Sequence, residues 1–100
     1  MSYLTVDLTP VITYLAQRGL TGHVLEGDAC DFIEAELPDS RLLQITPTAG
    51  RDGWDGWVVL LTGTTSFTSE AVYRSHPRGA AQQHGSRLGP MLDALTAVLA

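Results

Sequence analysis

Five short runs of strand length follow one another between residues 22 and 74, and this arrangement limits the possible fold more than any other feature of the chain. Turn-forming residues such as Gly27-Asp28, Pro38-Asp39-Ser40 and Gly63-Thr64-Thr65-Ser66 separate several of the runs. Tight turns join neighbouring strands in antiparallel order, so we predict an antiparallel meander of four to five strands. The runs cover residues 22–26, 31–37, 41–46, 57–62 and 67–74.

Helical periodicity flanks these runs on both sides. The spacing of Leu8, Val11, Ile12 and Leu15 predicts a core-facing helix over residues 10–18. Thr9 is the expected N-cap, Pro10 occupies the first helical position, and Gly19 provides the stop. A second apolar stripe predicts a C-terminal helix that is capped by Ser86 or Gly89; its members are Leu88, Met91, Leu92, Leu95, Val98 and Leu99.

Two helices can cover only one face of a five-stranded sheet. We therefore predict a two-layer α+β sandwich with the element order α-β-β-β-β-β-α. A chain of 100 residues suits a single domain, here residues 1–100. Two stretches resist assignment: residues 47–53 are expected to form a loop, and residues 75–89 either a mobile polar loop or a frayed start of the last helix.

Composition limits the possible functions. Cys30 is the single cysteine, which excludes an intrachain disulfide and a multi-cysteine metal site. The N-terminus lacks the basic and apolar regions of a signal peptide, and no apolar run is long enough to cross a membrane, so a cytoplasmic protein without membrane contact is expected. Only 17% of the residues are charged, which suggests apolar surface covered by a partner.

The charges argue against several chemistries. All six basic residues are arginines, which excludes a Schiff-base lysine and a phosphate-binding P-loop lysine. The net charge of −5 argues against direct nucleic-acid binding, because that requires a basic surface. No nucleophile, dinucleotide or metal motif is present, so we predict a non-enzymatic protein without cofactor or metal.

A tandem Asp-Gly-Trp repeat at residues 52–57 contains both tryptophans. If Asp55-Gly56 forms a hairpin turn, Trp54 and Trp57 face each other across it. If Asp52-Gly53 forms the turn, both rings lie on one strand, on opposite faces, with Gly56 at a bulge or a close backbone approach. The second alternative suits the flanking strand better. In that arrangement at most one ring is free to bind a partner. The other interpretation is that both rings pack in the core.

Two charged clusters are further candidates. An acidic stretch over residues 26–39 contains no basic side chain, and Glu34 and Glu36 are expected to share one face of their strand, with Asp31 on the other. A basic patch near the last helix could bind an anionic ligand; its members are Arg74, His76, Arg78, His84 and Arg87. The alternative for both clusters is solvated surface charge.

Three functions remain open from the sequence. The first is a module that binds another protein, or itself as a homodimer, through a sheet face or edge near Trp54 and Trp57. The second is an acidic inhibitor or nucleic-acid mimic that binds a basic partner through residues 26–39, with Glu34 and Glu36 at its centre. The third is a small anionic-ligand binder or enzyme that uses the basic patch of residues 74–87.

Overall fold

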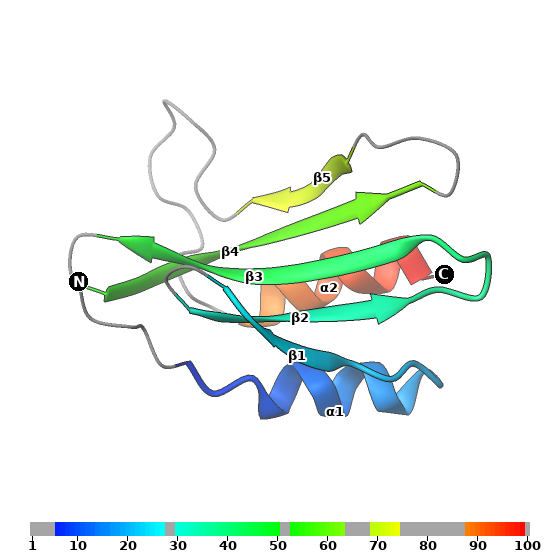
Figure 1. Cartoon of the computed structure of the whole chain (residues 1–100), viewed down its shortest axis with the longest axis horizontal. Helices are drawn as coiled ribbons and strands as arrows, with labels where there is room; N and C mark the ends of the chain where they lie inside the picture. Colours follow the sequence, from blue (N-terminus) through cyan, green and yellow to red (C-terminus); the bar gives the residue numbers. More distant parts are fainter. Residues whose placement is uncertain (1–5, 28–29, 51–52, 64–68, 75–87, 100) are drawn as a thin grey trace.

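The computed structural model describes residues 6–27, 30–50, 53–63, 69–74 and 88–99, and within the strands it leaves out the side chains of residues 49, 50, 53–55 and 69. The elements are α1 (Thr9–Gln17), β1 (His23–Glu26), β2 (Asp31–Glu36), β3 (Leu42–Gly50), β4 (Gly53–Thr62), β5 (Ser69–Arg74) and α2 (Leu88–Leu99). The strands pair antiparallel in the order β1-β2-β3-β4-β5 (Figure 1). The predicted α-β-β-β-β-β-α order is therefore confirmed.

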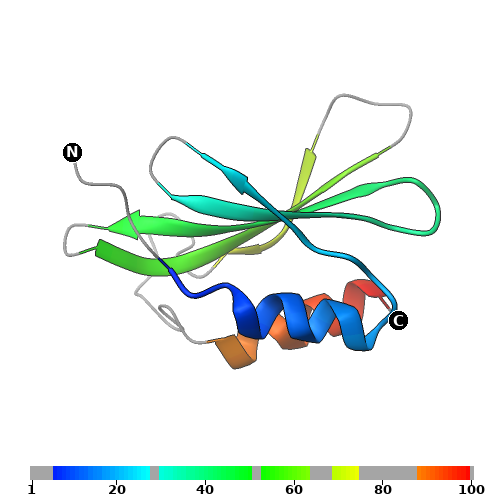
Figure 2. The same ribbon diagram turned by 60° about the horizontal axis from the view of Figure 1, so that its bottom comes forward.

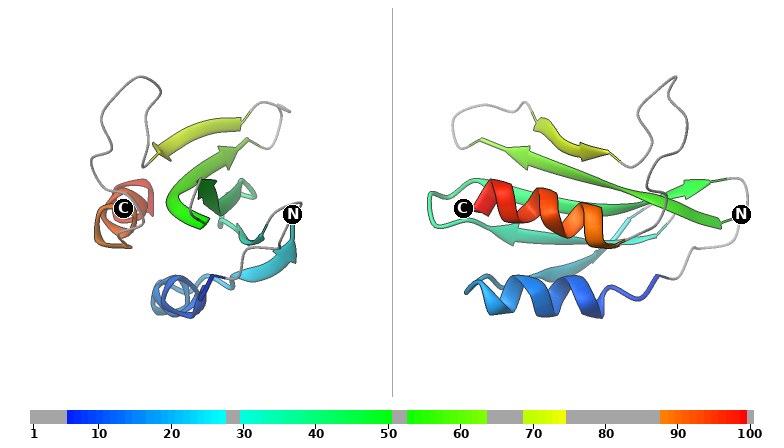
Figure 3. Two further views of the ribbon diagram at one scale, coloured as in Figure 1. Left: turned by 90° about the vertical axis from the view of Figure 1, so that its left-hand side faces the viewer. Right: turned by 180° about the vertical axis from the view of Figure 1, so that it is seen from behind.

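Both helices lie on one side of the sheet and run in the same direction (Figure 2). The sheet curves around them, as the end-on view in Figure 3 shows. Val11 and Leu15 of α1 and Met91 and Leu95 of α2 are completely buried against the sheet. Burying these side chains stabilises the contact between the two layers, and each contributes roughly 1.5–3 kcal/mol. The predicted two-layer sandwich is confirmed.

Alternation along the strands divides the sheet into a buried face and an uncovered one. The side chains that complete the core beneath the helices are Ile33, Ala35, Leu43, Ile45, Trp57 and Val59. Successive side chains of a strand point to opposite faces, so the residues between these lie on the other side of the sheet. No described helix covers that side, which we call the open face.

Helix α1 begins one residue earlier than expected and has a different cap. The carboxylate of Asp7 accepts the backbone N–H of Thr9 at 3.0 Å, and Leu8 is the residue that flanks the helix. Thr9 is therefore helical and is not the N-cap that we predicted. The expected stop at Gly19 is confirmed: its φ of 76° suits glycine, and its N–H donates to the carbonyl of Ala16 at 3.0 Å.

The predicted loop over residues 47–53 is wrong, because β3 continues through Pro47 to Gly50 and pairs with β4. The Cys30 thiol donates to the carbonyl of Pro47 at 3.4 Å, so this carbonyl points away from β4. In an antiparallel strand the N–H and C=O of one residue point the same way. The Pro47 nitrogen, which carries no hydrogen, therefore faces away from β4. Its missing N–H removes no hydrogen bond between β3 and β4, so the proline does not interrupt the hairpin.

Both tryptophans lie on β4, so the alternative in which Asp55-Gly56 forms the turn is wrong. The hairpin closes between Gly50 and Gly53, and residues 51–52 lie outside the described chain. A bulge follows: Ala49 pairs with Trp54 and Thr48 with Gly56, which leaves Asp55 as the extra residue. The irregularity that we predicted at Gly56 therefore lies one residue earlier, at Asp55.

Candidate functional site

The open face carries a mixed surface of apolar and polar side chains. Cross-strand pairing joins one residue from each strand into a row across this face, formed by His23, Glu34, Gln44, Leu60 and Ala71. Phe32, Leu42, Val58 and Leu60 are half-buried, yet none of them belongs to the core beneath the helices. These four side chains place apolar area where no described element covers it.

Glu34 and Glu36 both lie on the open face, as the alternation along β2 predicts. The side-chain amide of Gln44 donates to Glu34 Oε2 at 3.1 Å, which fixes that carboxylate across the β2–β3 pair. Glu36 is exposed and stands opposite Leu42. The two carboxylates therefore lie beside the apolar side chains and give this surface a negative charge.

The rest of the acidic stretch does not join them. Asp31 lies on the same face of β2 as the buried residues Ile33 and Ala35, opposite to Glu34 and Glu36, as expected. Asp39 lies in the turn after β2, where its Oδ1 accepts the N–H of Arg41 at 3.2 Å and its Oδ2 pairs with the guanidinium at 2.6 Å. The N–H of Arg41 lowers the pKa of this carboxyl. Asp28 lies outside the described residues. The stretch is therefore divided between two faces and a turn.

The structure places Trp57 in the core. Its side chain is completely buried, so it has no surface for a partner, and we leave it out of the candidate site. The side chain of Trp54 lies outside the described part of the chain. The register of Trp54 changes one expectation, however: the partners of Trp54 and Trp57 are Ala49 and Pro47, two residues apart on β3. The bulge therefore removes the odd spacing from which we predicted opposite faces.

The basic patch falls almost entirely outside the described residues. Arg74 is exposed at the end of β5, opposite Val58. His76, Arg78, His84 and Arg87 lie outside the described chain. Arg74 thus borders the open face next to an apolar side chain of β4, where a cation could pair with an acidic group of a partner.

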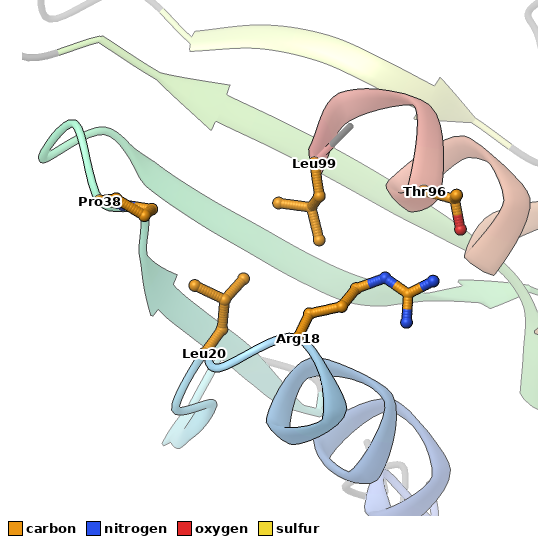
Figure 4. A pocket seen from close by; sticks show the side chains of 5 residues that line it. All are labelled: Arg18, Leu20, Pro38, Thr96 and Leu99. Atoms are coloured by element: carbon orange, nitrogen blue, oxygen red, sulfur yellow. The ribbon is translucent and has the colours of Figure 1, made fainter.

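A groove at one end of the molecule was not predicted. The C-terminal ends of α1 and α2 meet the turn between β2 and β3 there, and a cavity of about 370 Å³ lies between them. Leu20, Pro38 and Leu99 form its apolar side, while Arg18 and Thr96 line its polar side (Figure 4). The groove brings together three segments that are distant in the sequence.

Arg18 is the cation of this groove. Its guanidinium carbon lies 3.9 Å from the centre of the Tyr14 ring, which is within the range of a cation–π contact. Among the residues that the structure describes, no carboxylate pairs with Arg18. The one available signal in the sequence was the spacing of Tyr14 and Arg18, which are i and i+4 on a predicted helix and therefore neighbours on its surface. Chemically, this group could bind a carboxylate or a phosphate.

Comparison of the chain with protein-family models, curated proteins and solved structures found no significant match. Within the described ranges, no group of three or more His, Cys, Asp or Glu side chains could hold a metal ion. Neither described helix has the length and apolar character needed to cross a membrane.

Proposed function

We propose that this protein is a small non-enzymatic module that binds another protein through the open face of its sheet. The observation that carries the proposal is the position of Phe32, Leu42, Val58 and Leu60, half-buried side chains that point away from the core. Apolar side chains grouped on one surface and bordered by polar ones are typical of protein interfaces.

The charges around this apolar surface give the expected partner its character. Glu34 and Glu36 lie at the β2 side, and the exposed Arg74 lies at the β5 side. A partner with a basic group toward β2 and an acidic group toward β5 would be complementary. Such charges mainly set the orientation and the association rate, while the apolar contact supplies the affinity.

A double variant tests the proposal. Val58→Thr together with Leu60→Thr removes apolar surface from the open face and leaves a β-branched side chain, which suits a strand, at both positions. Affinity capture from an extract of the native host should recover a protein with the wild type and lose it with this variant. The matched control, Val98→Thr, makes the same kind of change on α2, next to the groove at the helix ends. It should retain the partner.

Two results would decide against the proposal. Both variants must first show the circular dichroism and unfolding midpoint of a folded protein. Recovery of the same proteins by the open-face variant and the wild type would overturn the open face as the binding surface. Loss of binding with Glu34→Gln and Glu36→Gln, with no effect of the Val58 and Leu60 substitutions, would favour the acidic inhibitor instead.

A further inference from the structure

Strand β1 is an edge of the sheet and is exposed along its whole length. It carries Val24, with 49% of its surface exposed, and Leu25, with 39%; these are the exposed large hydrophobic residues of the described chain. They are adjacent, so they lie on opposite faces of the sheet. An edge strand that presents apolar side chains on both faces is a template for pairing with another strand.

The backbone of β1 shows which groups are available for such pairing. The N–H of Gly27 donates to the carbonyl of Cys30 at 3.1 Å, which marks these two residues as a hydrogen-bonded pair of the β1–β2 hairpin. Hydrogen-bonded and non-bonded pairs alternate along an antiparallel ladder. The backbone groups of His23 and Leu25 therefore point toward β2, and those of Val24 and Glu26 point outward.

The opposite edge of the sheet differs. Strand β5 has a register shift where it pairs with Val59 and Leu60, and Glu70 and Arg74 are exposed along it. Bulges and charged side chains are common means of preventing edge-to-edge pairing. Strand β1 contains no proline and keeps a continuous register with β2 from His23 to Glu26. Of the two edges, β1 is the one suited to accept a strand.

We propose that a second copy of this chain pairs antiparallel with β1, with Leu25 opposite Leu25 of the second copy. A two-fold axis perpendicular to the sheet places the helix-covered faces of both copies on the same side. The residue that lies on this axis pairs with the same residue of the second copy. With Leu25 on the axis, Val24 stands opposite Glu26 of the second copy. The outward backbone groups of both residues then form hydrogen bonds in both copies.

The alternative register is less complete. With Val24 on the axis, the outward groups of Glu26 would need Gly22, which lies outside β1. The Leu25 register also makes Leu25 a non-hydrogen-bonded pair, in which side chains approach most closely. Leu25 already stands opposite Phe32 on the open face. The dimer would therefore bury a row of two leucines flanked by two phenylalanines, and no carboxylate would face another carboxylate across the axis.

The register can be tested by disulfide formation. In a Cys30→Ser background, which removes the native thiol, Leu25→Cys and Val24→Cys are compared under mild oxidation. A residue on the axis meets its copy at about 4.5 Å between Cα atoms, which a disulfide can span. We expect a covalent dimer from Leu25→Cys and little from Val24→Cys. Equal or stronger crosslinking of Val24→Cys would overturn the register, and no crosslinking of either would overturn pairing at β1.

Sedimentation measures the same contact without a crosslink. The wild type should show a dimer that dissociates on dilution, and Leu25→Glu should raise the dissociation constant by at least about tenfold, because like charges would face each other across the axis. The Val58→Thr/Leu60→Thr variant should still dimerise, since these residues lie away from β1. A wild type that is monomeric at every concentration would overturn the dimer and would leave the proposed binding at the open face unaffected.

Discussion

The guanidinium of Arg18 stacks on the ring of Tyr14, 3.9 Å from its centre, and the same ring connects the two helices. The Tyr14 hydroxyl is hydrogen-bonded to the hydroxyl of Thr96 on α2. Thr96 Oγ1 also donates to the carbonyl of Leu92 at 2.9 Å, and a hydroxyl has one hydrogen to donate. Tyr14 must therefore be the donor and Thr96 the acceptor. This contact fixes the spacing of α1 and α2 beside the groove at the helix ends.

Removal of the Tyr14 hydroxyl should weaken the contact between the helices. We expect Tyr14→Phe to lower the free energy of unfolding by about 0.5–1.5 kcal/mol, the usual net contribution of one hydrogen bond. Thr96→Val should have an effect of similar size, and the double variant should cost less than the sum of the two. Urea unfolding of the four proteins measures this coupling. Strict additivity would show that the bond does not contribute to stability.

Two glycines should respond to alanine with opposite signs. A methyl group at Gly22 would lie 3.1 Å from Ile33 Cγ2 and 3.2 Å from Leu15 Cδ1, so these two fully buried side chains would have to shift. We expect Gly22→Ala to destabilise the protein by about 1–3 kcal/mol. Gly89 lies in the first turn of α2, and no atom outside its own helix and chain neighbours lies within 4 Å of the added methyl; Gly89→Ala should stabilise by up to about 0.5–1 kcal/mol, because alanine loses less backbone entropy than glycine. Thermal unfolding of both variants checks the two signs.

Local periodicity is the reason that the fold could be predicted. The spacing of Val11 and Leu15, and of Met91 and Leu95, placed these side chains on core-facing helical stripes, and all four are buried. Alternation along β2 likewise placed Glu34 and Glu36 on one face. Such patterns follow from the geometry of a single element, so they can be derived without knowing its neighbours.

What could not be predicted depends on contacts between distant residues. The extra residue at Asp55 is defined only by the pairing of β4 with β3, and it invalidates the parity argument for Trp54 and Trp57. The extension of β3 through Pro47 is possible because the proline nitrogen faces away from β4, and this orientation depends on how β3 pairs with its neighbours. The groove at the helix ends requires Arg18 and Leu99 to meet, and nothing in the local pattern of either helix indicates this.

The burial of Trp57 predicts a large cost for reducing its side chain. Trp57→Phe should lower the free energy of unfolding by roughly 1–2 kcal/mol, because it leaves a cavity in a packed core. Val58→Ala changes the adjacent, half-buried residue on the open face and should cost less. Chemical denaturation of both variants provides the comparison. An equal cost for the two would contradict the assignment of Trp57 to the core.

Cys30 should make the stability of the protein depend on pH in the alkaline range. The residue is only 5% exposed, and burial, followed by the nearby charge of Asp31, raises the pKa of its thiol in the folded state. In the unfolded chain the pKa of a cysteine thiol is about 8.5. Because the folded pKa is the higher of the two, the unfolded state loses its proton first as the pH rises. The stability that depends on the neutral thiol is therefore fully present below about pH 8.5 and is lost as the pH rises through the folded pKa.

A Cys30→Ala variant isolates this effect, because every other titrating group is common to both proteins. The difference in unfolding free energy between the wild type and Cys30→Ala should be constant near neutral pH. Above about pH 8.5 the wild type should lose stability relative to Cys30→Ala. Urea unfolding across this range measures the difference. A thiol reagent added at neutral pH should react slowly with the folded wild type and quickly in urea, since only the unfolded chain exposes the thiolate. A difference that stays constant with pH would show that Cys30 ionises as readily in the folded protein as in the unfolded chain, contrary to its burial between β2 and the carbonyl of Pro47.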